Sequence, residues 1–117
     1  MTLRAPPPHV VDLVGTSLLI EFVELIEDVG RAFPGLTANS WWRDPESNRR
    51  AGGDRFSQHL AALAADLQIP AGVDRDAVTL MLRRQNLVAV PFGRAAIHVQ
   101  GFPASVGLVR RFLPSLA

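Results

Sequence analysis

The sequence predicts a small α+β domain in which helices pack against an antiparallel sheet. Three observations support this fold class: a long amphipathic helical pattern near the N-terminus, a second one later in the chain, and short apolar runs of strand length around the second. The chain has 117 residues and no cysteine. That length suits a single domain, 1–117, with a core that needs no disulfide. Residues 1–9, which contain Pro6-Pro7-Pro8, are expected to be an extended segment.

Apolar residues at helical spacing predict the first helix, with Thr16 or Ser17 as its N-cap. The apolar positions are Leu18, Leu19, Phe22, Val23, Ile26, Val29 and Phe33. Acidic residues mostly line the other side, and the stretch from Gly30 to Pro34-Gly35 ends the pattern. We expect the stripe to pack in the core; a groove for a partner is the alternative.

The segment Gly35 to Phe56 is rich in turn residues and is expected to be a long loop. Its two tryptophans and Arg43 argue against disorder, so a functional loop is favoured. The remaining elements are expected as a short helix at 56–62, a strand at 63–69, a helix at 74–85 that starts at Asp74 or Asp76, strands at 87–92 and 96–100 joined by a turn at Gly93-Arg94, and a terminal helix at 105–113.

Charge and hydropathy exclude several classes of function. The formal net charge is +1 and the arginines are scattered, so a nucleic-acid partner is not expected. Residues 10–26 are apolar but are interrupted by Asp12, Glu21 and Glu24, so no membrane span is expected. The N-terminus lacks the pattern of a signal peptide, which predicts cytoplasmic synthesis.

Two of the three histidines and one aspartate form a candidate metal site: His59, Asp66 and His98. Two imidazoles and one carboxylate can hold a zinc ion and leave a fourth position for water. Seven residues span ~10 Å along a helix and ~23 Å along a strand, so the chain must turn between His59 and Asp66. His98 lies in a predicted strand and can face Asp66 from a neighbouring one. A buried structural histidine and a capping aspartate are the alternative.

The order of motifs around these residues resembles the zinc D-Ala-D-Ala carboxypeptidase family, which includes L-alanyl-D-glutamate peptidases of phages and shares its fold with the hedgehog signalling domain. The resemblance covers about Ser40 to Gln100: a Trp-Trp-Arg segment at 41–43, then Ser57-x-His59 and Ala64-x-Asp66, then the late His98. It implies a hedgehog/DD-peptidase-like fold with Zn²⁺ bound by His59, Asp66 and His98. It also implies that Arg43 lies near the substrate carbonyl and that Ser57, Asn48 and Trp42 contact the substrate. Trp41 and Trp42 could instead pack in the core.

Two positions depart from the pattern of this family. A glycine that precedes the Ala-x-Asp motif is replaced by Ala62. The general base, usually three residues before the late histidine, is replaced by Ala95. Loss of a general base costs ~10²–10⁴ in rate, so three outcomes are open: Asp44 or Asp54 supplies a carboxylate, the enzyme is slow, or it is inactive.

The leading hypothesis is therefore a zinc metallopeptidase that cleaves peptidoglycan cross-link or stem peptides. The alternative is a catalytically silent zinc domain that binds cell wall or forms part of a phage particle. Without a signal peptide, a protein acting on the wall would be released by lysis or carried in a virion.

Overall fold

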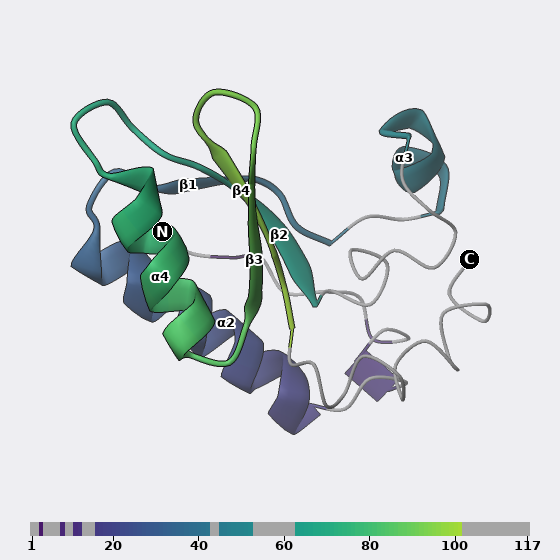
Figure 1. Ribbon diagram of the computed structural model, residues 1–117. Helices are drawn as coiled ribbons and strands as arrows, with labels where there is room; N and C mark the ends of the chain where they lie inside the picture. The colour runs from purple at the N-terminus through teal and green to yellow at the C-terminus, as the bar shows by residue number, and fades with distance from the viewer. Residues whose placement is uncertain are drawn as a thin grey trace.

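The computed structural model describes residues 3, 8, 11–12, 16–42, 45–52 and 63–101. Its elements within these ranges are α2 (Thr16–Ala32), β1 (Thr37–Ser40), α3 (Pro45–Arg50), β2 (Ala64–Gln68), α4 (Arg75–Arg84), β3 (Val88–Phe92) and β4 (Ala96–Gln100). The four strands form one antiparallel sheet with helices beside it, which confirms the predicted α+β class (Figure 1). No helix among the described residues is both long and apolar enough to cross a membrane.

The strands lie in the order β1-β2-β4-β3. Strand β4 therefore lies between β2 and β3, and it pairs antiparallel with both. The chain leaves β2 through α4, reaches the far edge at β3 and returns by a tight hairpin into the middle of the sheet. This topology places residues from two distant parts of the sequence, 64–68 and 96–100, directly side by side.

Alternate residues of the two central strands point to opposite faces of the sheet. One face carries the fully buried side chains of Leu67, Ile97 and Val99. Helices α2 and α4 cover that face, and they contribute the buried core residues Phe22, Ile26, Val29, Val78 and Leu82. The other face carries the half-buried residues of the same strands, Asp66, Gln68, Ala96, His98 and Gln100.

Most described elements match the sequence prediction. Helix α2 starts at Thr16, and α4 is capped by Asp74, whose carboxylate accepts a hydrogen bond from the backbone N–H of Asp76 at 2.9 Å. The predicted hairpin forms, and Gly93 in its turn has φ +57°, a left-handed conformation that favours glycine. The predicted helices at 56–62 and 105–113 lie outside the described residues. Pro8 is helical, within the segment 1–9 that was expected to be extended.

The prediction of a long loop with little regular structure over 35–56 is wrong, because this segment contains β1 and α3. Strand β1 has the sequence Thr-Ala-Asn-Ser, which shows no apolar alternation. Its conformation depends on pairing with β2, so tertiary context overrides its weak local preference. Helix α3 did carry a local signal, since Pro45 occupies its first position and Glu46 its first turn.

Two arginines of α4 fasten the helix to the β3–β4 hairpin. Arg83 donates from Nε and from its guanidinium NH2 group to the carbonyl of Ala89, at 3.1 and 2.9 Å. Arg75 donates to the carbonyls of Phe92, Gly93 and Ala96 at 3.0, 3.0 and 3.3 Å. These bonds hold the hairpin, and with it β4, against the helical layer.

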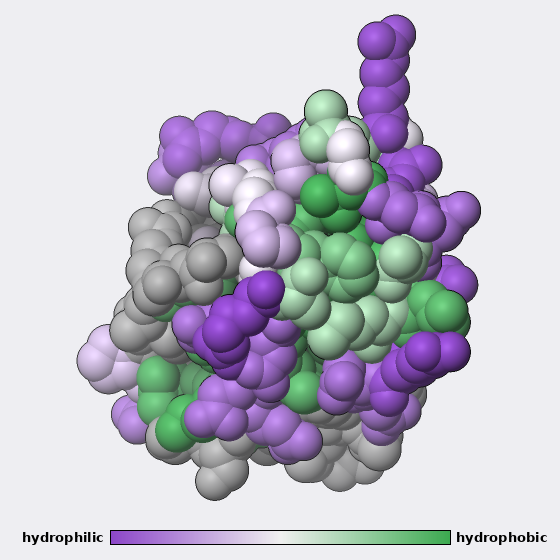
Figure 2. All heavy atoms as spheres, turned by 90° about the vertical axis from the view of Figure 1, so that its left-hand side faces the viewer, coloured by the Kyte–Doolittle hydropathy of each residue, from purple (hydrophilic) through white to green (hydrophobic). Residues whose placement is uncertain are grey.

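Figure 2 shows the side of the molecule that carries α4 and the connection between β2 and α4, where apolar surface is bordered by hydrophilic residues. A pocket near the hairpin turn is lined by residues 68–73 together with Arg75, Arg94 and Ala95. The pocket therefore joins the end of β2 to the turn that leads into β4.

Candidate metal centre

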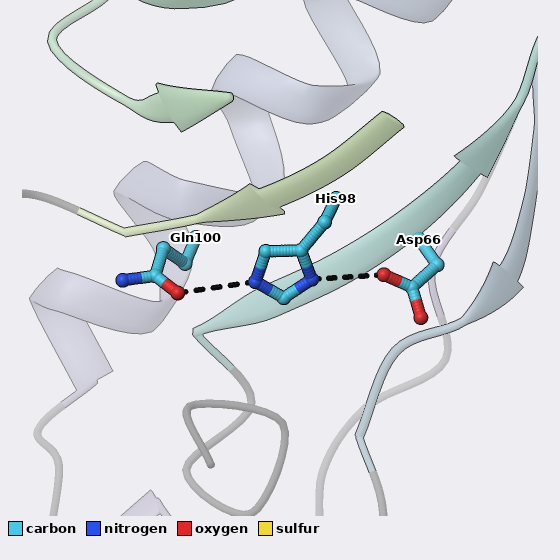
Figure 3. Close-up of polar contacts among 3 residues, drawn as sticks. All are labelled: Asp66, His98 and Gln100. Carbon is cyan, nitrogen blue, oxygen red and sulfur yellow. Dashed lines mark hydrogen bonds and ion pairs between the residues drawn. The ribbon is translucent and has the colours of Figure 1, made fainter. Parts of the chain in front are cut away.

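Strand pairing brings two of the three predicted metal ligands together. Asp66 of β2 lies directly opposite His98 of β4 in the antiparallel register. The Nδ1 atom of His98 lies 2.9 Å from Oδ1 of Asp66 (Figure 3). Their side chains are 30% and 17% exposed, respectively, so the pair is partly shielded and still accessible to water. The prediction that these residues face each other from neighbouring strands is confirmed.

The apolar neighbours of each residue determine which face it occupies. His98 lies between Ile97 and Val99, both fully buried against the helices. Because side chains alternate along a strand, burial of these two neighbours directs His98 to the opposite face. Asp66 is placed in the same way by Ala65 and Leu67. The hydrophobic core thus positions both polar side chains.

The imidazole of His98 lies between two acceptor oxygens. Its Nδ1 faces Asp66, and its Nε2 lies 3.0 Å from Oε1 of Gln100 (Figure 3). A neutral imidazole has a single N–H and can donate to only one of these oxygens. In one tautomer Nδ1–H donates to Asp66, and in the other Nε2–H donates to Gln100. A cation bound by Nδ1 and the carboxylate would leave Nε2–H to donate to Gln100. An imidazole nitrogen beside a carboxylate is also a donor set that Zn²⁺ prefers. Asp66 and His98 therefore fit a zinc ion as two of its ligands.

The described residues supply only part of a complete site. Over 16–42, 45–52 and 63–101, no group of three or more His, Cys, Asp or Glu side chains could hold a metal ion. The third predicted ligand, His59, lies outside the described residues, as do Arg43 and Ser57. Their roles remain predictions.

The described aromatic and amide candidates lie in different surroundings. Trp41 is 6% exposed and belongs to the hydrophobic core, and Trp42 packs partly buried against that core. Asn48 is 2% exposed and lies in α3, which stands apart from the sheet in Figure 1. Contacts of Trp42 and Asn48 with a substrate remain predictions.

Ala95, at the position where the resemblance expects a general base, lies in the turn between β3 and β4. Its carbonyl accepts a hydrogen bond from the backbone N–H of Ile69 at 2.7 Å, and its methyl group lines the pocket that also contains Arg94. A methyl group cannot accept a proton, so this position contributes structure and no base.

Two residues beside the pair were not predicted as part of the site. Ser40 of β1 lies opposite Asp66 in the register, and Gln100 contacts His98. Gln100 could have been found from the two-residue period of a strand, which places residues 98 and 100 on one face. Ser40 carried no comparable signal, because its segment was expected to be a loop.

The described residues thus form a mixed helix–sheet domain with a histidine–aspartate pair on one sheet face. The family model for Peptidase M15 matches residues 8–100, which is most of the chain. The chain therefore belongs to the peptidase M15 family, whose members are generally zinc-dependent metallopeptidases. Neither the comparison with curated proteins nor that with solved structures gives a match.

Proposed function

We propose that this protein is a zinc metallopeptidase that hydrolyses peptide bonds in peptidoglycan cross-link or stem peptides. The observation that carries the proposal is the contact between His98 and Asp66 on one sheet face of a peptidase M15 chain. Peptidoglycan as the substrate is supported by the likeness of the motifs at 41–66 to those of peptidases that act on D-amino-acid peptides.

Different residues of this chain would bind zinc, stabilise the carbonyl oxygen and bind the peptide. Asp66 and His98, with His59 as the third ligand, would hold zinc, which when bound lowers the pKa of its water toward ~7 and polarises the scissile carbonyl. Arg43 would donate hydrogen bonds to the carbonyl oxygen as negative charge develops there, because its guanidinium stays protonated. Ser57, Asn48 and Trp42 would bind the peptide.

A catalytically silent zinc domain that binds cell wall, or forms part of a phage particle, is the second candidate. One observation favours it: Ala95 stands where a general base is expected, and its methyl group cannot take a proton from water. Asp44 and Asp54 are the candidates for a substitute base, and both lie outside the described residues.

Metal analysis and peptidoglycan digestion test the proposal together. The protein purified with added zinc should contain about one equivalent of the metal, and His98→Ala should contain much less. Incubation with purified peptidoglycan should release new amino groups, detected by mass spectrometry, and His98→Ala should release none. Wild-type protein with less than half an equivalent of zinc would overturn the proposed site.

Ala95→Glu separates the two candidate functions. If the missing base limits an active enzyme, this variant should release amino groups up to ~10²–10⁴ times faster than wild type. Wild-type protein that binds zinc and peptidoglycan but releases nothing at any pH would support the silent domain.

A further inference from the structure

We infer that Gln100 is a positioning residue for His98: its side-chain oxygen holds the Nε2–H of the imidazole and thereby directs Nδ1 to the metal. This inference rests on the proposed zinc site and adds a residue that acts through His98.

The geometry of β4 places Gln100 beside the imidazole. Residues 98 and 100 are two apart on one strand, so their side chains share a face. Oε1 of Gln100 lies 3.0 Å from Nε2 of His98, and Asp66 lies at the opposite side of the ring (Figure 3). The two ring nitrogens therefore face different partners.

The chemistry of the two partners assigns a separate task to each nitrogen. A side-chain amide oxygen can only accept, so Gln100 suits a proton on Nε2, whereas the Asp66 carboxylate, 2.9 Å from Nδ1, suits a proton on Nδ1. A cation held by Nδ1 and Asp66 would replace the Nδ1 proton, and Nε2–H would then donate to Gln100. With the proton on Nε2, the lone pair of Nδ1 points toward the carboxylate of Asp66, which is where a shared cation would bind. Acceptors behind a ligating histidine fix its ring and tautomer, and their removal typically lowers metal affinity ~10–100-fold.

Gln100 is held in place before any metal binds. Its backbone pairs with Ala64 of β2 on one side and with Val88 of β3 on the other. The next residue, Gly101, donates its backbone N–H to the carbonyl of Leu63 at 2.7 Å. Because β4 is a central strand that is paired on both sides, the backbone from which the Gln100 side chain projects is fixed.

Three variants test the inference. Gln100→Met removes the acceptor and keeps the length of the side chain, whereas Gln100→Glu keeps an acceptor oxygen. Gln68→Met is the matched control: Gln68 lies on the same sheet face, two residues from Asp66, but its Oε1 accepts from Nδ2 of Asn39 at 3.0 Å.

Zinc affinity, measured by competition with a chelator, is the first readout. Gln100→Met should bind zinc ~10–100-fold more weakly than wild type. Gln100→Glu should bind at least as tightly as wild type, and Gln68→Met should match wild type. The second readout is the ¹⁵N NMR spectrum of zinc-loaded wild type, in which His98 should show a metal-bound Nδ1 and a protonated Nε2.

The outcomes separate this inference from the proposed function. If wild type binds no zinc, both are overturned. If wild type binds zinc and Gln100→Met binds it equally well, or if the spectrum shows metal on Nε2, the role of Gln100 is overturned and the zinc site stands. Equal losses in Gln100→Met and Gln100→Glu would also overturn the role of Gln100, because they would follow from altered packing and not from a lost acceptor.

Discussion

The two faces of the β2–β4 strand pair are built from adjacent residues and have opposite properties. Leu67 and Ile97 are fully buried under helices α2 and α4. Asp66 and His98, their neighbours in sequence, lie half-buried on the other face and contact each other at 2.9 Å. The core face therefore stabilises the sheet, and the stable sheet holds Asp66 and His98 in position on the polar face.

This comparison shows how the apolar face aligns the polar pair. Register in a sheet is strongly specified where one face is buried, because a shift of one residue would expose every core side chain. The apolar face therefore fixes the alignment of Asp66 with His98. A substitution on one face should mainly change stability, and a substitution on the other should mainly change metal binding.

The largest effect is expected from Leu67→Ala, on the core face. Removing this fully buried side chain should lower the free energy of unfolding by ~2–5 kcal/mol, because it leaves a cavity between the sheet and the helices. Urea denaturation measures the change. Gln68→Ala, one residue away on the other face, is the control and should cost ~1 kcal/mol or less. Similar losses of unfolding free energy in both variants would contradict the assignment of stability to the core face.

Asp66→Asn, on the polar face, should change zinc affinity much more than stability. This nearly isosteric change should weaken zinc binding by more than the ~10–100-fold typical of a residue behind a ligand, because it removes a ligating charge. The metal-free stability should change by ~1 kcal/mol or less, since the pair is partly exposed. Chelator competition and denaturation in EDTA measure the two quantities. A large loss of metal-free stability would mean that the pair is itself a structural element.

The smallest effect is expected at the start of α4, in the helical layer. Asp74→Ala removes the carboxylate that caps the Asp76 N–H and should cost ~0.5–2 kcal/mol. Asp76→Ala keeps the capped N–H and loses only a charge in the first turn, worth ~0.3–1 kcal/mol. Thermal unfolding of both variants compares them. A greater loss in Asp76→Ala would contradict the assigned cap.

The sequence predicted the elements whose local pattern agrees with their tertiary role. Helix α2 has an apolar stripe, α4 has a capping aspartate and terminal arginines, and the hairpin has a glycine where its turn needs positive φ. Strand β1 was missed because its four residues gain their conformation from pairing with β2. The local sequence of β1 cannot predict pairing with β2, which lies nearly thirty residues further along the chain.

The sequence also predicted part of the candidate site. The residue types and apolar flanks of Asp66 and His98 identified them as potential ligands on adjacent strands, and the register confirms their contact. Gln100 was not predicted as part of the site, although the two-residue period of a strand places it on the same face as His98. Ser40 required the register of β1, which no pattern in its own segment contains.

The hydrogen bonds from Arg83 to the carbonyl of Ala89 have a consequence for self-association. Strand β3 lies at the edge of the sheet, and an edge strand can recruit another chain through its outward backbone groups. Arg83 already occupies the outward carbonyl of Ala89, and Pro91, two residues further along the same edge, has no N–H to offer. Both features disfavour the addition of a further strand at the β3 edge of the sheet.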